Sequence, residues 1–350
     1  MTELFNTPFS WSNSMGEFTL LNGRGGDNVI KTIFRQTGET TLFDLGDLRN
    51  MTYGELLEVR QALISHGHFD HVFGFDALLR ATFPLQRPIL FAGPVGLAQQ
   101  LAWRMKGYTW NLANPGQVDH VVREIHRDGS VTSWHTTNNE FEPKPVENPE
   151  VWTDALNPAP FEAPAAFVGR IKGDLSLWAL CLDHAGTDSV AYCAVSDAKI
   201  KFKVDLLPQL GLRPGPWVGQ FQKAYLAGEL DREFQIGSVT KKTAELADIL
   251  LEVKPGERFC YLTDFGATPE NLERVRPFIA GADYLGIETN FRADQEEQAA
   301  SDGHLTTKQA ARIIVECGVK SYQTFHYSNA YQTNPDEIEA ETRMFVETFK

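Results

Sequence analysis

Residues 64–71 read Ile64-Ser65-His66-Gly67-His68-Phe69-Asp70-His71 and follow directly on the apolar residues Ala62 and Leu63. An apolar run that ends in a turn is typical of the carboxyl end of a buried strand, where ligands gather. In an extended segment His66 and His68 point to the same side and can bind one metal ion, while Asp70 and His71 in the following turn can bind a second. The spacing therefore predicts a two-metal site.

The alternative is a polar loop that is rich in histidine by chance. The chain has nine histidines, and three of them fall within residues 66–71 directly after an apolar run, which argues against chance. A two-metal site needs more ligands than this motif supplies. Four later segments each place one ligand-type residue near an apolar run, namely His184, Asp264, His304 and His326.

The composition indicates a large globular core. The chain has 350 residues, of which 42% are hydrophobic, and this is enough for one large domain. The N-terminal residues 1–6 do not resemble a signal peptide, and no run approaches the roughly 18 apolar residues that span a bilayer. We therefore expect a cytoplasmic protein with no membrane partner. The four cysteines form no Cys-x-x-Cys pair, which argues against zinc held by sulfur.

The acidic balance bears on the substrate. The chain carries 32 basic and 46 acidic residues, a formal charge of −14, which opposes non-specific binding to a polyanion. Metal ions would reverse that field locally, and a confined basic patch can serve a single scissile phosphate. The charge therefore weakens a nucleic-acid hypothesis without excluding it.

Alternating strand and helix patterns surround the motif. Residues 17–45 have the alternation and the glycine-rich turn of a β-meander. Further strands are expected at 88–91, 117–125, 130–135, 166–172, 176–182, 189–195, 258–263, 282–288 and 321–325, and helices at 53–61, 75–82, 95–105, 271–279 and 306–317. Between 107 and 164, seven prolines and few apolar periods indicate an insertion.

The motif at 66–71 resembles the signature of the metallo-β-lactamase superfamily. The order of the later segments resembles ribonuclease Z, the family of endonucleases that trim the 3′ trailer of precursor tRNA. The similarity runs from Leu20 to Tyr331 and rests on His71-Val72-Phe73-Gly74-Phe75, Leu182-Asp183-His184, Gly211-Leu212-Arg213-Pro214-Gly215-Pro216, Thr263-Asp264, His304-Leu305-Thr306-Thr307 and Phe325-His326-Tyr327-Ser328. The order of these pieces is more specific than any one of them.

The resemblance implies a set of metal ligands. They are His66, His68 and His184 on one ion and Asp70, His71 and His326 on the other, with Asp264 bridging both. Zinc is the expected metal, although histidine and carboxylate ligands also suit manganese or iron.

The resemblance also implies roles in the reaction. Asp70 would hold a proton of the attacking water, and His304, which binds no metal in this family, would protonate the departing 3′ oxygen. Asp44, in Asp44-Leu45-Gly46-Asp47, would orient the ligands, although a turn-capping aspartate fits the same pattern.

The fold implied is α/β, a four-layer αββα sandwich of two mixed sheets with helices outside. It would form a single domain over 1–350, with the insertion at 107–164 and an arm-like segment at 199–229, in the region where the family's tRNA-gripping arm projects. The implied partners are precursor tRNA and a second copy of the chain in a homodimer. The chain departs from the family in the metal motif, where relatives usually carry a small residue and glycine instead of Gly67 and Phe69.

Three other functions remain open. The same metal site could hydrolyse a small molecule such as a cyclic nucleotide, a phosphotriester, an aryl sulfate or a lactone, which suits the acidic composition. A redox role with iron is disfavoured because no flavin or rubredoxin-like segment follows. A non-catalytic binding module is disfavoured because none of the seven ligands is missing.

Overall fold

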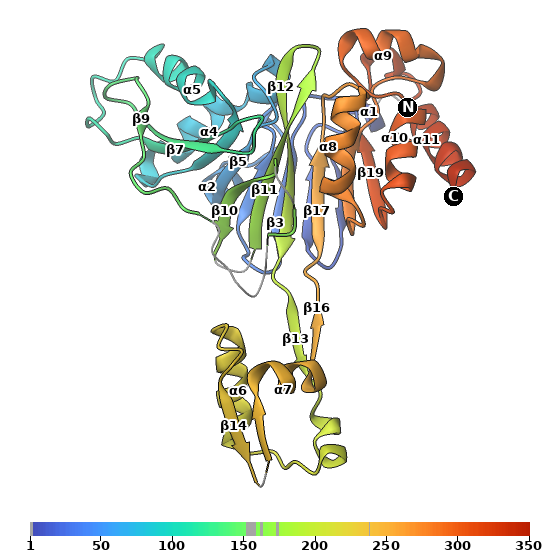
Figure 1. The fold of residues 1–350 in the computed structure, drawn as a ribbon. Coiled ribbons are helices and arrows are strands. Elements are labelled where there is room, and N and C mark those ends of the chain that lie inside the picture. The colour runs from blue at the N-terminus through green and yellow to red at the C-terminus, as the bar shows by residue number, and fades with distance from the viewer. Residues whose placement is uncertain (1–2, 152–158, 162–163, 173–174, 238) are drawn as a thin grey trace. The chain divides into compact units, whose positions relative to one another are not determined.

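The computed structural model describes residues 3–151, 159–161, 164–172, 175–237 and 239–350. The chain forms two compact units (Figure 1). The first comprises the chain up to Val151 together with Phe161–Ser196 and Arg258–Lys350, and the second is built on Asp197–Glu257. The segment 197–257 has a hydrophobic core of its own.

The first sheet of the larger unit contains nine strands in sequence order. They are β1 (Phe9–Ser12), β2 (Gly16–Leu20), β3 (Ile30–Phe34), β4 (Thr40–Phe43), β5 (Val59–Leu63), β6 (Leu90–Pro94), β7 (Asp119–Ile125), β8 (Val131–Thr137) and β9 (Lys144–Pro145). Strands β1 to β4 form the expected antiparallel meander, β4 to β7 run parallel, and β8 and β9 are antiparallel.

The second sheet has the order β10-β11-β12-β17-β18-β19. Its strands are β10 (Ala166–Ile171), β11 (Leu175–His184), β12 (Thr187–Ser196), β17 (Arg258–Leu262), β18 (Tyr284–Glu288) and β19 (Ser321–Phe325). Strands β10, β11 and β12 each pair antiparallel with the next strand in this order. Strands β17, β18 and β19 run parallel. Both sheets are therefore mixed.

The two sheets pack face to face through aromatic side chains. The Phe259 ring of the second sheet lies 4.5 Å from the Phe18 ring and 5.2 Å from the Phe43 ring of the first, measured between centroids. All three side chains are fully buried. Such rings remove large apolar areas from water, which makes this layer the centre of the core.

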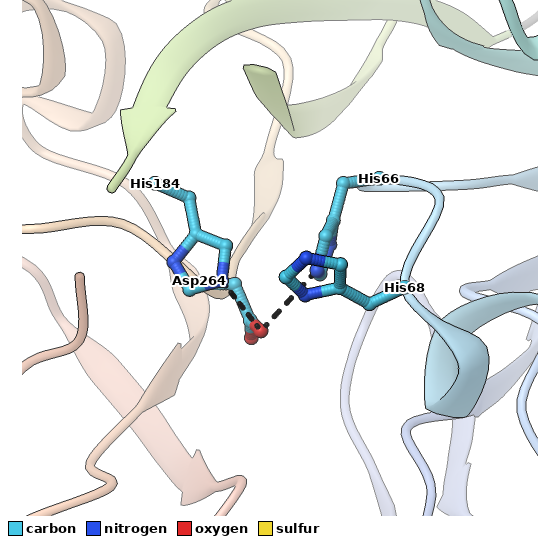
Figure 2. Close-up of side chains that lie close together, drawn as sticks. All are labelled: His66, His68, His184 and Asp264. Carbon is cyan, nitrogen blue, oxygen red and sulfur yellow. Dashed lines mark ion pairs between the residues drawn. The ribbon is translucent and has the colours of Figure 1, made fainter. Parts of the chain in front are cut away.

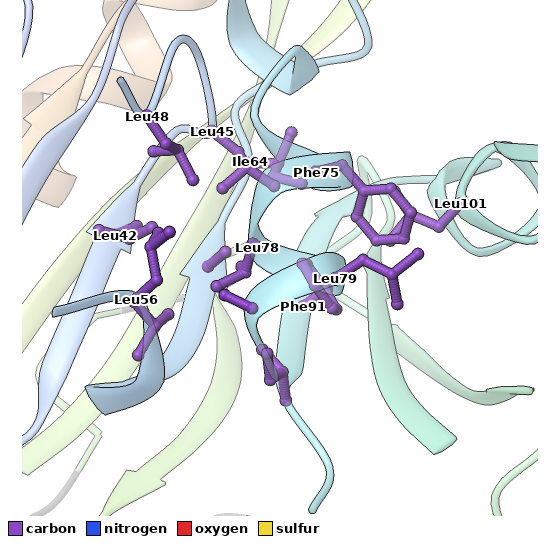
Figure 3. Close-up of a cluster of buried hydrophobic side chains, with 14 of the residues drawn as sticks. Leu42, Leu45, Leu48, Leu56, Ile64, Phe75, Leu78, Leu79, Phe91 and Leu101 are labelled. Carbon is purple, nitrogen blue, oxygen red and sulfur yellow. The ribbon is translucent and has the colours of Figure 1, made fainter. Parts of the chain in front are cut away.

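Helices cover the outer faces of the sheets. Those of the larger unit are α1 (Glu3–Asn6), α2 (Tyr53–Glu58), α3 (Phe69–Val72), α4 (Phe75–Thr82), α5 (Leu97–Lys106), α8 (Pro269–Ile279), α9 (Glu296–Asp302), α10 (Thr307–Glu316) and α11 (Asp336–Phe349). Phe75 and Leu78 of α4 and Leu101 of α5 pack with Leu42, Ile64 and Phe91 of the first sheet and its strand ends (Figure 3). Helix α8 lies on the second sheet (Figure 1), so the expected αββα arrangement is confirmed.

Helix α2 is shorter than the sequence pattern predicts. Thr52 and Glu55 form a capping box at its start, but the helix ends at Glu58 and not at Gln61. Val59 instead begins β5, which pairs with β4 and β6. The backbone groups of 59–63 are satisfied by two neighbouring strands, and this tertiary pairing overrides the local helical pattern.

The expected insertion is partly an extension of the first sheet. Strands β7, β8 and β9 lie within residues 107–164 and add to the edge after β6. The strands expected at 117–125 and 130–135 are thus confirmed. Residues 152–158 and 162–163 of the expected insertion lie outside the described residues.

The smaller unit continues beyond the arm-like segment expected at 199–229. It contains β13 (Lys199–Phe202) paired with β16 (Leu251–Lys254), the hairpin strands β14 (Glu233–Ile236) and β15 (Val239–Lys242), and the helices α6 (Pro216–Leu226) and α7 (Thr243–Leu250). Phe221 of α6 and Leu246 and Leu250 of α7 are buried together. The first and last strands of the unit, β13 and β16, pair with each other, and the unit ends at Glu257.

In the described part of the chain, no helix has both the length and the apolar character needed to cross a membrane.

His120 on β7 generates a prediction about stability. Its ring is buried near Phe75 and Phe91, and neither ring nitrogen has a hydrogen-bond partner among the described residues. Burial lowers the pKa of His120 to about 4. Between pH 6.5 and pH 4 the unfolded chain therefore binds a proton that the folded chain does not, and stability falls as the pH falls.

We expect His120→Phe to remove this loss. Urea unfolding of both proteins at pH 7 and pH 5 should show that the wild type loses about 2 kcal/mol more than the variant between the two values, at about 1.4 kcal/mol per pH unit. The other titrating groups are the same in both proteins, so their contributions to the free energy of unfolding cancel in this comparison. Equal losses would show that His120 does not titrate in this way.

Candidate metal centre

Six strand ends converge at one edge of the two sheets in the larger unit. Asp44 follows β4, the motif at 65–71 follows β5, His184 ends β11, Asp264 lies two residues after β17, Glu288 ends β18 and His326 follows β19. The carboxyl ends of strands that run in one direction meet at the same edge of a sheet. The alternation of strands and polar turns in the sequence therefore accounts for this convergence.

Three of these residues have an unusual backbone conformation. Asp44, Asp264 and His326 have φ values of 60°, 49° and 58°. Residues other than glycine seldom adopt this left-handed region, although aspartate and histidine tolerate it better than most. Such conformations concentrate at functional sites, because the surrounding structure must hold them in place.

His66, His68, His184 and Asp264 form the first ligand group (Figure 2). One ligand atom from each lies within 4.8 Å of the others. The carboxylate Oδ2 of Asp264 lies 3.6 Å from Nε2 of His66 and 3.8 Å from Nε2 of His184. Three imidazoles and one carboxylate around a common point match the donor set of zinc and related divalent ions.

Asp70, His71 and His326 form a second group beside the first. Oδ2 of Asp70 lies 3.3 Å from Nε2 of His71 and 3.7 Å from Nε2 of His326. The same Oδ2 of Asp264 that faces the first group lies 3.3 Å from Nε2 of His71. Asp264 therefore faces both groups. All seven residues expected as ligands meet at this edge.

The hydrogen bonds of the histidines leave their Nε2 atoms free to bind a metal. Nδ1 of His71 donates to Asp44 at 2.8 Å, and Nδ1 of His184 donates to the Gly303 carbonyl oxygen at 2.8 Å. Because both partners only accept, Nδ1 of each ring carries a hydrogen, and Nε2 is the ring atom that would bind a metal.

Two buried nitrogen atoms support the fit to metal ions. Nε2 of His66 and Nε2 of His71 have no hydrogen-bond partner in the part of the chain that the structure describes. A buried polar atom without a partner costs free energy, and a metal ion would satisfy both atoms. Burial lowers the pKa of His66 to about 2, so this ring is neutral and can act as a ligand. The residues therefore fit divalent cations.

Asp44 holds the metal motif in position. Oδ1 accepts from the backbone N–H of Ser65 at 2.6 Å, and Oδ2 accepts from the Ser65 hydroxyl, from His71 and from the Tyr261 hydroxyl at 2.6 Å. The orienting role, which the sequence left open against simple turn capping, is thus the one that the geometry supports. Ser65 and Tyr261 were not singled out by the sequence pattern.

His304 lies beside the ligands and is paired with a carboxylate that the sequence analysis missed. Its Nδ1 donates to Oε2 of Glu288 at 2.8 Å, and Oε1 of Glu288 accepts from the backbone N–H of Phe265 at 3.1 Å. Burial disfavours the charged ring, but the Glu288 carboxylate raises the pKa of His304 above its ordinary value. Glu288 ends an apolar strand, the same signal that identified Asp264, and could have been found in this way.

Asn271 on α8 joins two of the ligand-bearing segments. Its side chain is buried, accepts from the backbone N–H of Asp183, and donates to the carbonyl oxygens of Asp183 and Gly266. Asp183 precedes His184, and Gly266 follows Asp264 by two residues. No motif in the sequence pointed to this residue.

The centre opens into a hollow of about 700 Å³. Its described lining includes His68, Asp70, His304 and His326, with the further carboxylates Asp27 and Asp302. None of these described lining residues is lysine or arginine. A substrate phosphate that enters the hollow must therefore be neutralised by metal ions or by protonated histidine.

Sequence comparison identifies the family. A model described as "Metallo-beta-lactamase superfamily" matches residues 34–130, and one described as "Beta-lactamase superfamily domain" matches residues 232–327. The chain is 30% identical over 300 residues to a ribonuclease Z of Deinococcus radiodurans, with 84% of each protein covered. It belongs to the ribonuclease Z family. A ribonuclease Z of Oceanobacillus iheyensis is 25% identical over 334 residues, which cover 92% of this chain and 90% of that protein.

Solved structures agree with the fold. Unliganded yeast PDE1 has a TM-score of 0.52 at 10% identity, covering 96% of this chain and 95% of that one. The metallo-beta-lactamase fold protein YhfI from Bacillus subtilis has a TM-score of 0.50 at 14% identity, with 95% and 92% covered. At these identities the likeness concerns the fold alone. The ribonuclease Z family and the metallo-β-lactamase fold, both expected from the sequence, are confirmed.

A conservative change at Asp44 should weaken metal binding. Asp44→Asn keeps the side-chain volume and tolerates the left-handed backbone, but its amide nitrogen cannot accept the hydrogen bonds that converge on Oδ2. We expect metal affinity, measured by competition with a chelator, to fall about 10- to 100-fold. Asp128→Asn, at an exposed turn near Ser130, is the control and should bind as the wild type does. Unchanged affinity in Asp44→Asn would show that Asp44 has no orienting role.

Proposed function

We propose that this member of the ribonuclease Z family is a metal-dependent endoribonuclease that removes the 3′ trailer of precursor tRNA. The observation that carries the proposal is the pair His304–Glu288 beside a complete ligand set. A ribose 3′ oxygen is a poor leaving group and needs a proton, whereas an aryl phosphate or sulfate leaves without one. A fixed acid at the centre thus favours a sugar phosphodiester.

The number and roles of the metal ions are part of this proposal. His66, His68 and His184 would hold one divalent ion, Asp70, His71 and His326 a second, and Asp264 would bridge them. Zinc is the metal that we propose, with manganese or iron as alternatives. When bound, two such ions make hydroxide available at neutral pH and withdraw charge from the phosphoryl oxygens.

The protein's own side chains move the protons. Asp70 lines the hollow, where its carboxylate would take a proton from the attacking water. Glu288 fixes the His304 ring through Nδ1, so Nε2 would deliver a proton to the departing 3′ oxygen.

The smaller unit supplies basic groups that the hollow lacks. Lys201, Lys203, Arg213 and Lys223 show no ion pair within the described chain, whereas the basic residues Arg232, Lys241, Lys242 and Lys254 pair with carboxylates. Unpaired cations are available to phosphates. We propose that this unit grips the tRNA. A homodimer, expected from the family resemblance, and a cytoplasmic location, expected from the sequence, are also part of the proposal.

A small ester is the second candidate substrate, because the hollow is acidic and no basic residue appears in its described lining. The test is cleavage of a precursor tRNA with a short 3′ trailer by the metal-loaded protein, with His68→Ala as the inactive control. Cleavage after the discriminator base that weakens steeply with salt supports the tRNA function. No cleavage, together with salt-independent turnover of a small diester, would favour the second candidate.

His304→Ala should lower kcat for precursor tRNA about 10²- to 10⁴-fold, because general acid catalysis contributes that much. The loss should be much smaller with a 3′-phosphorothiolate at the scissile bond, because a thiolate leaves without protonation. His135→Ala, which breaks a surface His–Asp pair with Asp119, should leave both rates unchanged. An equal loss on the two substrates would exclude leaving-group protonation by His304.

A further inference from the structure

Phe69 is an exposed aromatic residue inside the metal motif. It lies between His68 and Asp70, and 72% of its surface is open to solvent. Phe73, one helical turn later, is 44% exposed. Neither ring contributes to the buried clusters of the described core. Large apolar side chains on the rim of a site need a reason, because their burial would be favourable.

The two rings form a rigid pair. Their centroids lie 4.9 Å apart with a tilt of 41°, and the backbone N–H of Phe73 donates to the Phe69 carbonyl oxygen at 2.9 Å. Arg104 of α5 fixes the same turn, since it donates to the Val72 carbonyl oxygen at 2.5 Å and pairs with Asp76 at 2.8 Å. The turn that carries the two rings is therefore held by a backbone hydrogen bond and by Arg104.

The backbone of Phe69 lies next to the hollow at the metal centre. The residues on either side of Phe69, His68 and Asp70, both line that hollow. A phosphodiester held at the ligands has a nucleotide on each side, and successive nucleotides lie several ångströms apart. One of the flanking bases therefore comes within reach of the Phe69 ring.

The charges around the hollow favour an uncharged contact there. Asp27 and Asp302 add negative charge to the lining, and no lysine or arginine appears among the described lining residues. The RNA nucleotides next to the scissile bond therefore gain little from ion pairs with the residues of the hollow. Stacking of a base on an aromatic ring is worth enough to matter and does not depend on charge or on base identity.

We propose that Phe69, supported by Phe73, is the stacking surface for a nucleobase next to the scissile phosphate. The inference rests on the proposed endoribonuclease function and adds a residue that sets preference for single-stranded RNA.

The test compares four proteins, the wild type and the variants Phe69→Ala, Phe69→Leu and Phe69→Trp, on precursor tRNA with a short trailer. We expect Phe69→Ala and Phe69→Leu to raise KM about tenfold, and Phe69→Trp to retain the wild-type KM. The increase should be the same at low and high salt, because stacking is not ionic. The Tm of all four should agree, since the ring is largely exposed.

The outcomes separate stacking from other roles. A KM that is unchanged in Phe69→Ala, or that is equal in the leucine and tryptophan variants, would overturn the proposal. Dissociation of a dimer by Phe69→Ala, seen by analytical ultracentrifugation, would assign the rings to a protein interface instead. If the wild type fails to cleave the RNA, the proposed function fails, and anisotropy with a short single-stranded RNA then decides the stacking. Equal binding by the wild type and Phe69→Ala would overturn it.

Discussion

The carboxylate of Asp264 is almost completely buried, and the structure around it must compensate its negative charge. Its side chain is 3% exposed, and burying a carboxylate alone is costly. Burial would raise its pKa, yet His326 and His71 hold that pKa well below its usual range. These two rings come from different sheets, so the charge is compensated only when the sheets stay face to face with their strand ends level. The aromatic layer of Phe18, Phe43 and Phe259 provides that alignment.

How much the sequence reveals depends on whether a residue's role is local. The metal motif, the meander and helix α4 could be predicted, because apolar periodicity and turn residues specify them within a few positions. The end of α2 could not be predicted, because Val59 begins β5, which pairs with strands distant in sequence. The same holds for Asn271, whose three hydrogen bonds reach segments that only the fold brings close. Glu288 is intermediate, because its strand-end position was visible but its pairing with His304 was not.

An acidic chain can bind an anionic substrate if its charges lie in suitable positions. Negative charge in the hollow would attract divalent cations, and bound cations would neutralise one phosphate at the point of reaction. Contacts farther along the RNA are assigned to unpaired basic residues of the smaller unit and to the uncharged surface of Phe69. The net charge of −14 therefore limits non-specific binding while it permits a specific site. Function in this view depends on where charges lie and not on their sum.

The most direct test of the central claim is the metal content per chain of the wild type and of Asp264→Asn, measured by mass spectrometry after exhaustive dialysis at neutral pH. Asparagine fits the volume and the left-handed backbone at this position, but it lacks the charge that faces both ligand groups. The account predicts about two ions per chain in the wild type and a loss of both in the variant. One ion in the wild type, or two retained in Asp264→Asn, would contradict a centre that Asp264 bridges.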